Sequence, residues 1–345
     1  MGLRTYVIRR LLLLIPTLLG VTLLIFAIMQ FLPINIRAMM YITDIKELKD
    51  LPKLIEEHGL AQPVYIQYFR WLKGVFMDHT LGVDRYNQPV YEAIMNRLPA
   101  SVELALFSIP PIILIGIFFG TTAAVHKDKA FDHMTRLLAI MGTSLPSFWL
   151  GIVLLSVFFA GLGWFPPQRW STSVNLYVSN PYSSWKWYTH FITIDGLLNG
   201  RPDITLDGLR HLVLPVTVLT MLNIALIMRM MRSSMLESLS KDYITAAKAK
   251  GLSNKEVINK HARKNAMIPV VTLSGLLVAG LLTGVVITET VFDLKGIGAY
   301  AAESAAIPDI PVVLSYALLS GFIFVIANLI VDILYAYLDP RIRLD

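Results

Sequence analysis

The sequence predicts an all-α integral membrane protein with six transmembrane helices, a long outer segment after the first, and a short cytoplasmic helix between the fourth and fifth. Of its 345 residues, 55% are hydrophobic and only 16% are charged, with a mean hydropathy of +0.60. That composition is typical of a membrane protein. Six runs of at least 17 residues lack Asp, Glu, Lys, Arg and His, and about 20 residues cross a bilayer. These runs are 11–32, 104–125, 137–168, 212–228, 265–288 and 310–331.

The positive charges indicate how the chain is oriented. Lys and Arg gather before the first run, between the second and third, between the fourth and fifth, and after the sixth. Because cytoplasmic loops are enriched in these residues, both termini are expected to face the cytoplasm. The protein itself is expected in the plasma or inner cell membrane. This placement of Lys and Arg on one side of the lipid bilayer accounts for the net charge of +6, so a nucleic-acid partner is not needed to explain it.

We expect residues 1–345 to form a single transmembrane domain. The first run is 22 residues long and lacks a small-residue cleavage site, so we interpret it as a retained span and not as a signal peptide. The predicted spans are approximately 11–32, 101–125, 137–161, 210–229, 266–288 and 311–336, with outer segments 33–98 and 162–209 and a cytoplasmic loop 230–265.

The first outer segment contains two predicted helices. Residues 44–58 are highly charged and could be broken at Pro52. Residues 62–77 place apolar and aromatic side chains on one face and polar ones on the other, which predicts an amphipathic helix. That helix could pack on the spans, lie on the membrane or contact a partner.

Glycine and proline mark special points in the second, third and fifth spans. Gly116 and Gly120 have the spacing that lets helices approach closely, and so do Gly280 and Gly284. Pro146 should distort the third span and free backbone groups near mid-membrane. The second outer segment is rich in Trp and Tyr, which favours either an interfacial aromatic belt or a surface that receives a substrate-loaded partner.

The loop between the fourth and fifth spans carries the most information. Residues 229–264 hold nine Lys or Arg and three acidic residues. Ile244 to Lys250 is an alanine-rich helix candidate, and Gly251 after it is suited to a helix C-cap or tight turn. Ser253 or Asn254 can cap a next helix, and Pro269 is expected near the first turn of the fifth span. A solvated basic loop that only fixes topology is the alternative.

This loop resembles the EAA loop of ABC-importer permeases, specifically the dipeptide/oligopeptide branch. The resemblance rests on DYITAAKAKGL at 242–252 and HARKNAMIPV at 261–270. Thr245 stands where many permeases have Glu. SLPSFWLG at 144–151, ETVF at 289–292 and GIG at 296–298 are also similar to that branch, so the resemblance covers nearly the whole chain.

The resemblance implies a permease subunit whose loop forms a coupling helix that docks on an ATPase. The implied partners are a homologous second permease, two ATPase subunits and an extracytoplasmic substrate-binding protein. ATP and Mg would be bound by those ATPases, and this chain would bind no cofactor. The implied coupling residues are Asp242, Thr245, Ala246, Ala247, Lys248, Lys250, Gly251 and Leu252, with both alanines and the glycine in the docking surface.

Two other function classes fit the sequence less well. Charged residues sit only toward the ends of the apolar runs, whereas ion-coupled transporters and intramembrane enzymes generally need ionisable groups inside the membrane. The absence of cysteine excludes disulfides, thiolate catalysis and cysteine-ligated metals, and the seven histidines are scattered without an HExxH or similar pair. The chain also lacks G-x-x-x-x-G-K-[ST], so it is not expected to be an ATP-hydrolysing enzyme.

The substrate class stays open at this point. The branch that the chain resembles includes importers of peptides, of oligosaccharides and of nickel. Polar residues within the spans are candidates for lining the path by which a solute crosses by alternating access. They are Thr143, Ser144, Asn223, Thr272, Ser274 and Thr283.

Overall fold

The computed structural model describes residues 3–39, 51–307 and 309–338. Apart from one isolated bridge between Val83 and Pro89, the regular structure in these residues is helical. The first four helices are α1 (Leu3–Met29), α2 (Ile34–Met39), α3 (Leu51–Glu57) and α4 (Val64–Phe76). Then come α5 (Val90–Val125), α6 (Ala130–Ser144), α7 (Ser147–Leu154), the π-helical η2 (Leu155–Gly161), α8 (Thr172–Val178), α9 (Ile192–Leu198), α10 (Pro202–Leu239), α11 (Asp242–Ala249), α12 (Asn254–Glu256), the π-helical η3 (Val257–Ala262), α13 (Arg263–Leu282), α14 (Val286–Val291), α15 (Ile297–Ala306) and α16 (Ile310–Leu338).

Five helices of the described chain are long and apolar enough to cross a membrane, and a bent pair makes up to six. The five are Val7–Met29, Val90–Val125, Pro202–Leu239, Asn254–Leu282 and Ile310–Ile333. The bent pair is α6 with α7 and η2, whose axes turn by 101°. The all-helical membrane fold is therefore confirmed, but residues 137–161 do not form one straight span.

The turn between α6 and α7 has a local cause. Proline has no amide hydrogen and disfavours the helical conformation in the residue before it. Leu145 has φ −82° and ψ 129°, and Pro146 has φ −64° and ψ 135°, so both are extended. The predicted distortion at Pro146 is thus a full break between two helices.

Several helices extend beyond the predicted spans. α5 begins 11 residues before residue 101, at Val90, and α10 takes in residues 202–209 and 230–239. The fifth candidate span begins at Asn254, so Pro269 lies inside α13 and not near its first turn. Charge-free runs mark only the part of a helix inside hydrocarbon, whereas helical hydrogen bonding continues into polar surroundings.

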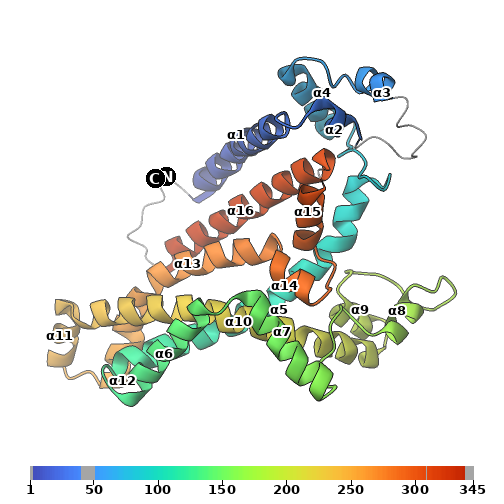
Figure 1. Ribbon diagram of the computed structural model, residues 1–345. Coiled ribbons are helices and arrows are strands. Elements are labelled where there is room, and N and C mark those ends of the chain that lie inside the picture. Colours follow the sequence, from blue (N-terminus) through green and yellow to red (C-terminus); the bar gives the residue numbers. More distant parts are fainter. Residues whose placement is uncertain (1–2, 40–50, 308, 339–345) are drawn as a thin grey trace.

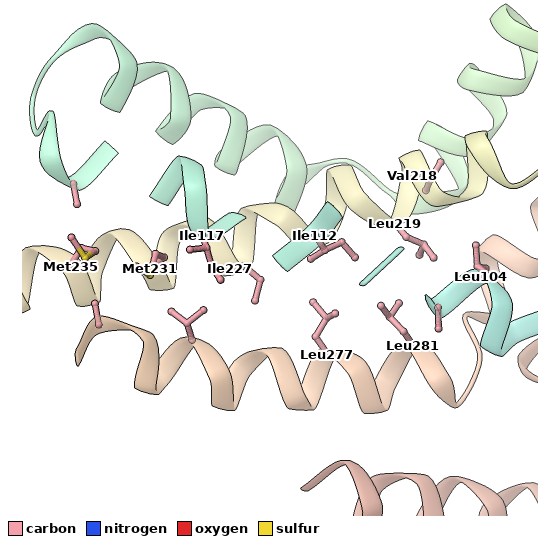
Figure 2. Packing of buried hydrophobic residues seen from close by; sticks show 14 of the residues in the cluster. Leu104, Ile112, Ile117, Val218, Leu219, Ile227, Met231, Met235, Leu277 and Leu281 are labelled. Carbon is pink, nitrogen blue, oxygen red and sulfur yellow. The ribbon is translucent and has the colours of Figure 1, made fainter. Parts of the chain in front are cut away.

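The main hydrophobic core lies where α5, α10 and α13 meet (Figure 2). Leu104, Ile112 and Ile117 of α5 meet α10 side chains from Val218 to Met235, with Leu277 and Leu281 of α13 opposite. The two small residues of α5 permit this contact. A Cβ added at Gly116 would lie 2.7 Å from Ile227, and one at Gly120 only 2.6 Å from the Met228 carbonyl oxygen.

The second glycine pair does not behave in the same way. Gly280 has no atom of this chain within 4 Å of an added Cβ. Gly284 lies beyond the end of α13 at φ +100°, with the backbone of Gly298 2.5 Å from an added Cβ. The spacing therefore predicts helix packing correctly for α5 and wrongly for α13.

The amphipathic α4 packs on the spans. Tyr68 is 6% exposed and contacts Phe26 of α1 and Leu314 of α16. Its hydroxyl lies 2.9 Å from the Thr22 hydroxyl and donates to the Leu19 carbonyl at 3.0 Å. Neighbouring rings on the same helix remain exposed, so α4 is only partly covered. In the other predicted helix of this segment, Pro52 stands in the first turn of α3, and residues 44–50 lie outside the described residues.

The aromatic residues of the second outer segment form a small core of their own. Trp185 is 9% exposed and packs with Val178, Ile192 and Ile204, and Trp187 stacks on His190 at 5.5 Å. Tyr182, by contrast, is 96% exposed. Packing between α8, α9 and the start of α10 therefore accounts for Trp170, Tyr177 and Trp185. Trp164 and Tyr188, like Tyr182, are more than half exposed and are not explained by this core.

Seven of the short helices lie toward one end or the other of the long ones (Figure 1). α11 and α12 lie beyond one end of α10, and the beginning of α1 points toward that same side. α2, α3, α4, α8 and α9 lie at the other end. The bundle thus separates one polar helical layer from the other.

Candidate functional site

The alanine-rich segment forms α11, which is held against the rest of the chain along one side. Ile244 is 1% exposed and Ala247 is 6% exposed, and both belong to the main core together with Met235 and Val257. The Ser238 hydroxyl, at the end of α10, contacts the Tyr243 hydroxyl and donates to the Ala262 carbonyl at 3.0 Å. These contacts join α11 to α10 and α10 to η3, and α11 also packs against η3.

Gly251 ends α11 in the conformation that the sequence predicts. Its φ is +79°, in the left-handed region that residues with a Cβ rarely adopt. The Gly251 amide donates to the Lys248 carbonyl at 2.9 Å and the Leu252 amide to the Ala247 carbonyl at 3.4 Å. This pair of bonds is a Schellman motif. The space beside Gly251 is open, with no atom of this chain within 4 Å of an added Cβ.

A capping box starts the next helix immediately. The Ser253 hydroxyl accepts from the Glu256 amide at 3.3 Å, while the Glu256 carboxylate accepts from the Ser253 amide at 3.4 Å. Of the two capping candidates, Ser253 fills the position. Together with the glycine motif, this cap fixes the direction of the chain on both sides of a short turn.

The predicted coupling residues divide into an exposed face and an inward face. Ala247 faces the core of this chain and is not available to a partner, which corrects its assignment to a docking surface. Leu252 is half-buried and packs against that core. The exposed members are Asp242, Thr245, Ala246, Lys248, Lys250 and Gly251.

A buried ion-pair cluster ties α6 to α10 on the same side of the bundle. Asp132 is 0% exposed. Its carboxylate accepts from Arg232 at 2.5 and 2.8 Å and from Arg136 at 2.6 Å. The Asp128 amide also donates to it at 3.0 Å. Sequence reasoning missed this cluster, because 100 residues separate Asp132 from Arg232 and no local pattern joins them.

Two further carboxylates are buried, one in α5 and one in α14. Glu103 is 2% exposed and accepts from Thr193 and from Arg169 at 3.0 Å, which fastens the outer segment to α5. Burial lowers the pKa of Arg169, and the Glu103 charge opposes that effect. Glu289 is 0% exposed and accepts from the Ser101 hydroxyl at 2.6 Å and from the Ala299 amide at 2.8 Å.

The structure does not gather the six candidate path residues into one site. Thr143 and Ser144 are exposed at the end of α6, and Asn223 is half-buried on α10. Thr272 is exposed on α13, whereas the Ser274 hydroxyl is buried without a hydrogen-bond partner. Thr283 is buried at the end of α13. Thr143 and Asn223 hydrogen-bond to carbonyls one turn back in their own helices.

In the described part of the chain, no group of three or more His, Asp or Glu side chains could hold a metal ion. The arrangement on the α11 side offers a shaped, mostly basic helical surface on rigid supports. This surface is joined to α10 through the contact between Tyr243 and Ser238, and it packs against η3, which leads into α13.

Comparison with known proteins gives consistent matches along the whole chain. Residues 112–344 match the family described as "Binding-protein-dependent transport system inner membrane component", and residues 3–105 match the N-terminal region of such membrane components. A dipeptide transport system permease protein of Alkalihalophilus pseudofirmus is 38% identical over 338 residues, covering 98% of this chain and 99% of the relative.

Two more relatives cover similar lengths. An oligopeptide transport system permease protein of Bacillus subtilis is 34% identical over 342 residues, covering 98% of this chain and 99% of the relative. A dipeptide transport system permease protein of Escherichia coli K12 is 38% identical over 340 residues, with 98% of each chain covered.

Proposed function

Because this chain belongs to the family of binding-protein-dependent transport system inner membrane components, we propose that it is a permease subunit of an ATP-driven importer of dipeptides or oligopeptides. The observation that carries the proposal is the match over 98% of the chain to permeases named for dipeptide transport. The oligosaccharide and nickel alternatives have no comparable support.

The proposed assembly contains a second, homologous permease, two ATPase subunits that bind ATP and Mg, and an extracytoplasmic substrate-binding protein. The family description itself names dependence on a binding protein. The absence of a phosphate-binding G-x-x-x-x-G-K-[ST] motif in the sequence supports placing ATP hydrolysis in the partners.

In the proposed mechanism, α11 is the coupling helix. Its exposed residues Thr245, Ala246 and Lys248 would contact the ATPase, with Gly251 leaving open space at the helix end. Ile244 and Ala247 would pass the movement to α10 and α13 through the core they share. The spans would then alternate between outward-open and inward-open arrangements as ATP closes the ATPase pair.

The orientation follows from the same proposal. The basic loop and both termini would face the cytoplasm, and the layer formed by α2–α4, α8 and α9 would face the binding protein. The clustering of Lys and Arg at 229–264 supports this direction.

The test is reconstitution of the full assembly in liposomes with its binding protein. We expect ATP-dependent uptake of labelled dipeptides or oligopeptides, and a peptide as the ligand that co-purifies with the binding protein. An assembly that imports a saccharide or nickel but no peptide would contradict the substrate proposal. ATP hydrolysis by the purified subunit without partners would contradict the permease assignment.

A further inference from the structure

The outer side of the bundle contains a polar cavity of about 430 Å³. Its wall is formed by the start of α5, residues 168–172, α8 and the turn 293–295 that follows α14. The volume is within the range of roughly 300–1,000 Å³ found for small-molecule sites. A neighbouring cavity of about 670 Å³ shares Arg97, Asp293 and Lys295 with the first, so these three charged residues stand where the two hollows meet.

The turn that presents two of these charges is conformationally unusual. Asp293 has a φ of +50° and Lys295 a φ of +51°, although neither is glycine. Leu294 between them is 3% exposed and anchored in the main core. A left-handed backbone costs such residues energy, so it persists only where the surroundings impose it, commonly at functional sites.

The surroundings that impose it are well defined. The Leu294 amide donates to the Glu289 carbonyl at 2.9 Å, and the Asp293 amide to the Thr290 carbonyl at 3.2 Å. Gly296, next in the turn, lies so close to the buried Glu289 carboxylate that an added Cβ would be 2.4 Å from it. The turn is therefore a rigid support that holds an acidic and a basic side chain exposed, two residues apart.

The three charges have no ionic partners within the described chain. Arg97 stacks its guanidinium 4.0 Å from the centre of the Tyr300 ring and donates to a backbone carbonyl. None of the ion pairs between described residues includes Arg97, Lys295 or Asp293. For Asp293, the side-chain contact is a long hydrogen bond of 3.4 Å from the Gln168 amide.

Arg97 and Lys295 are cations, Asp293 is an anion, and they do not form ion pairs with each other. They are therefore suited to binding a ligand that has both a negatively and a positively charged group. A peptide with free ends has a carboxylate at one end and an ammonium at the other. Building on the proposed function, we propose that this outer cavity binds the substrate peptide by its ends. In this site Arg97 and Lys295 hold the terminal carboxylate, and Asp293 holds the terminal ammonium.

The shape of the site favours a small solute over a protein surface. The charged groups line concave hollows, and the Trp170 ring contributes an apolar wall against which a substrate side chain can lie. An acidic patch of the binding protein is the competing occupant. Such a patch would form ion pairs with Arg97 and Lys295 but would make no favourable contact with Asp293.

The test uses the reconstituted importer with saturating binding protein preloaded with one of three dipeptides, one with free ends, one C-terminally amidated and one N-acetylated. In the unmodified importer, blocking either end should slow uptake about tenfold, as expected for loss of a charge-assisted contact. Arg97→Gln and Lys295→Gln should each slow uptake of the free dipeptide and abolish the penalty for amidation. Asp293→Asn should abolish the penalty for acetylation.

Lys186→Gln is the matched control, because Lys186 is an exposed cation of the outer segment that lines neither cavity. Uptake by this variant should stay within twofold of the unmodified importer. Lys295→Arg should retain the preference for a free carboxylate, and co-purification of the ATPase subunits shows that each variant assembles.

Two outcomes would overturn the site. Neutral variants that keep both end preferences would show that the cavity does not contact the peptide ends. Docking of the binding protein is measured by how far the unloaded binding protein stimulates ATP hydrolysis. If the variants lose docking in parallel with uptake, the two cations contact the binding protein and not the peptide. In both cases the unmodified importer still moves peptides, so the proposed function survives. An importer that moves no peptide would refute both.

Discussion

At Gly251 a single backbone angle separates two helices that must point in different directions. The φ of +79° lets the Schellman bonds close α11 while the capping box at Ser253 starts the next helix. Because no atom of this chain lies near the missing side chain, a substitution here changes the backbone preference without creating an internal clash.

Gly251→Val should weaken ATPase docking or uncouple hydrolysis from uptake, because a β-branched side chain is strained by about 1–3 kcal/mol in this conformation. Gly251→Asn should be milder, since Asn adopts left-handed angles more readily. The measurements are pull-down of the ATPase subunits and uptake in vesicles. Gly200→Val is the matched control, with φ +67° and open space at the outer end of the molecule. Equal effects of both valines would contradict a coupling role.

The sequence indicated some of these residues and not others, for physical reasons. Gly251 and Ser253 were predictable because caps and turns depend on adjacent residues. The inward direction of Ala247 was not, since the face an eight-residue helix buries depends on where its neighbours lie. The contacts of Glu289 with Ser101 and of Asp293 with Gln168 join residues 188 and 125 positions apart, so no short spacing predicts them.

The contact between α6 and α10 depends on Asp132, which lies in α6 and accepts hydrogen bonds from Arg232 of α10. Asp132→Asn removes the charge that holds Arg232 and Arg136. Both arginines are partly exposed, at 21% and 43%. We therefore expect a loss of roughly 1–3 kcal/mol, the cost of leaving partly buried polar groups unmatched, and not the larger cost of a fully buried pair.

Thermal unfolding of the purified assembly measures this change. Asp128→Asn is the comparison, because that carboxylate is 65% exposed and bonds only the Arg136 end of the cluster. It should lower the midpoint much less than Asp132→Asn. Similar shifts for both variants would show that the buried cluster does not fasten α6.

The contact between α5 and α10 depends on the absence of a side chain at Gly120. Gly120→Ala would place a Cβ 2.6 Å from the Met228 carbonyl oxygen, so the helices must separate at an expected cost of about 1–3 kcal/mol. Gly280→Ala meets no atom of this chain and should be neutral or slightly stabilising, because Ala favours helix over Gly. Unfolding midpoints of the two variants in detergent give the comparison, and a larger loss for Gly280→Ala would be inconsistent with the packing described.

The spanning helices were predictable in approximate position but not in extent. Uncharged runs locate the helices because hydrocarbon excludes charge, and Pro146 marks the break because its ring disrupts helical bonding. The same rule misses the polar ends of α5, α10 and α13. It also cannot report the 101° turn at Pro146, which depends on how α6 and α7 pack on α10 and α14.

At the scale of the whole molecule, the two polar layers should lie on opposite sides of the membrane. Ser173 in α8 and Ser253 at the cap of α12 are both exposed, and Figure 1 shows α8 and α12 at opposite ends of the bundle. Single cysteines placed at these two positions should react with an impermeant reagent from opposite sides. The chain has no native cysteine, so the background is zero. We expect Ser173Cys to label from outside intact cells and Ser253Cys only after the membrane is opened. Labelling of both from one side would refute the proposed orientation.

The position of α1 bears on how the protein is made. α1 is the least buried candidate span, with 11% of its most apolar window covered, and it lies chiefly against α16. A ribosome synthesises α1 long before α16, so α1 lies in the lipid without its main partner until the residues from 310 onward have been made. Closure of this bundle is therefore a late event in biogenesis, and a nascent chain stopped before residue 310 holds an N-terminal helix without its main partner.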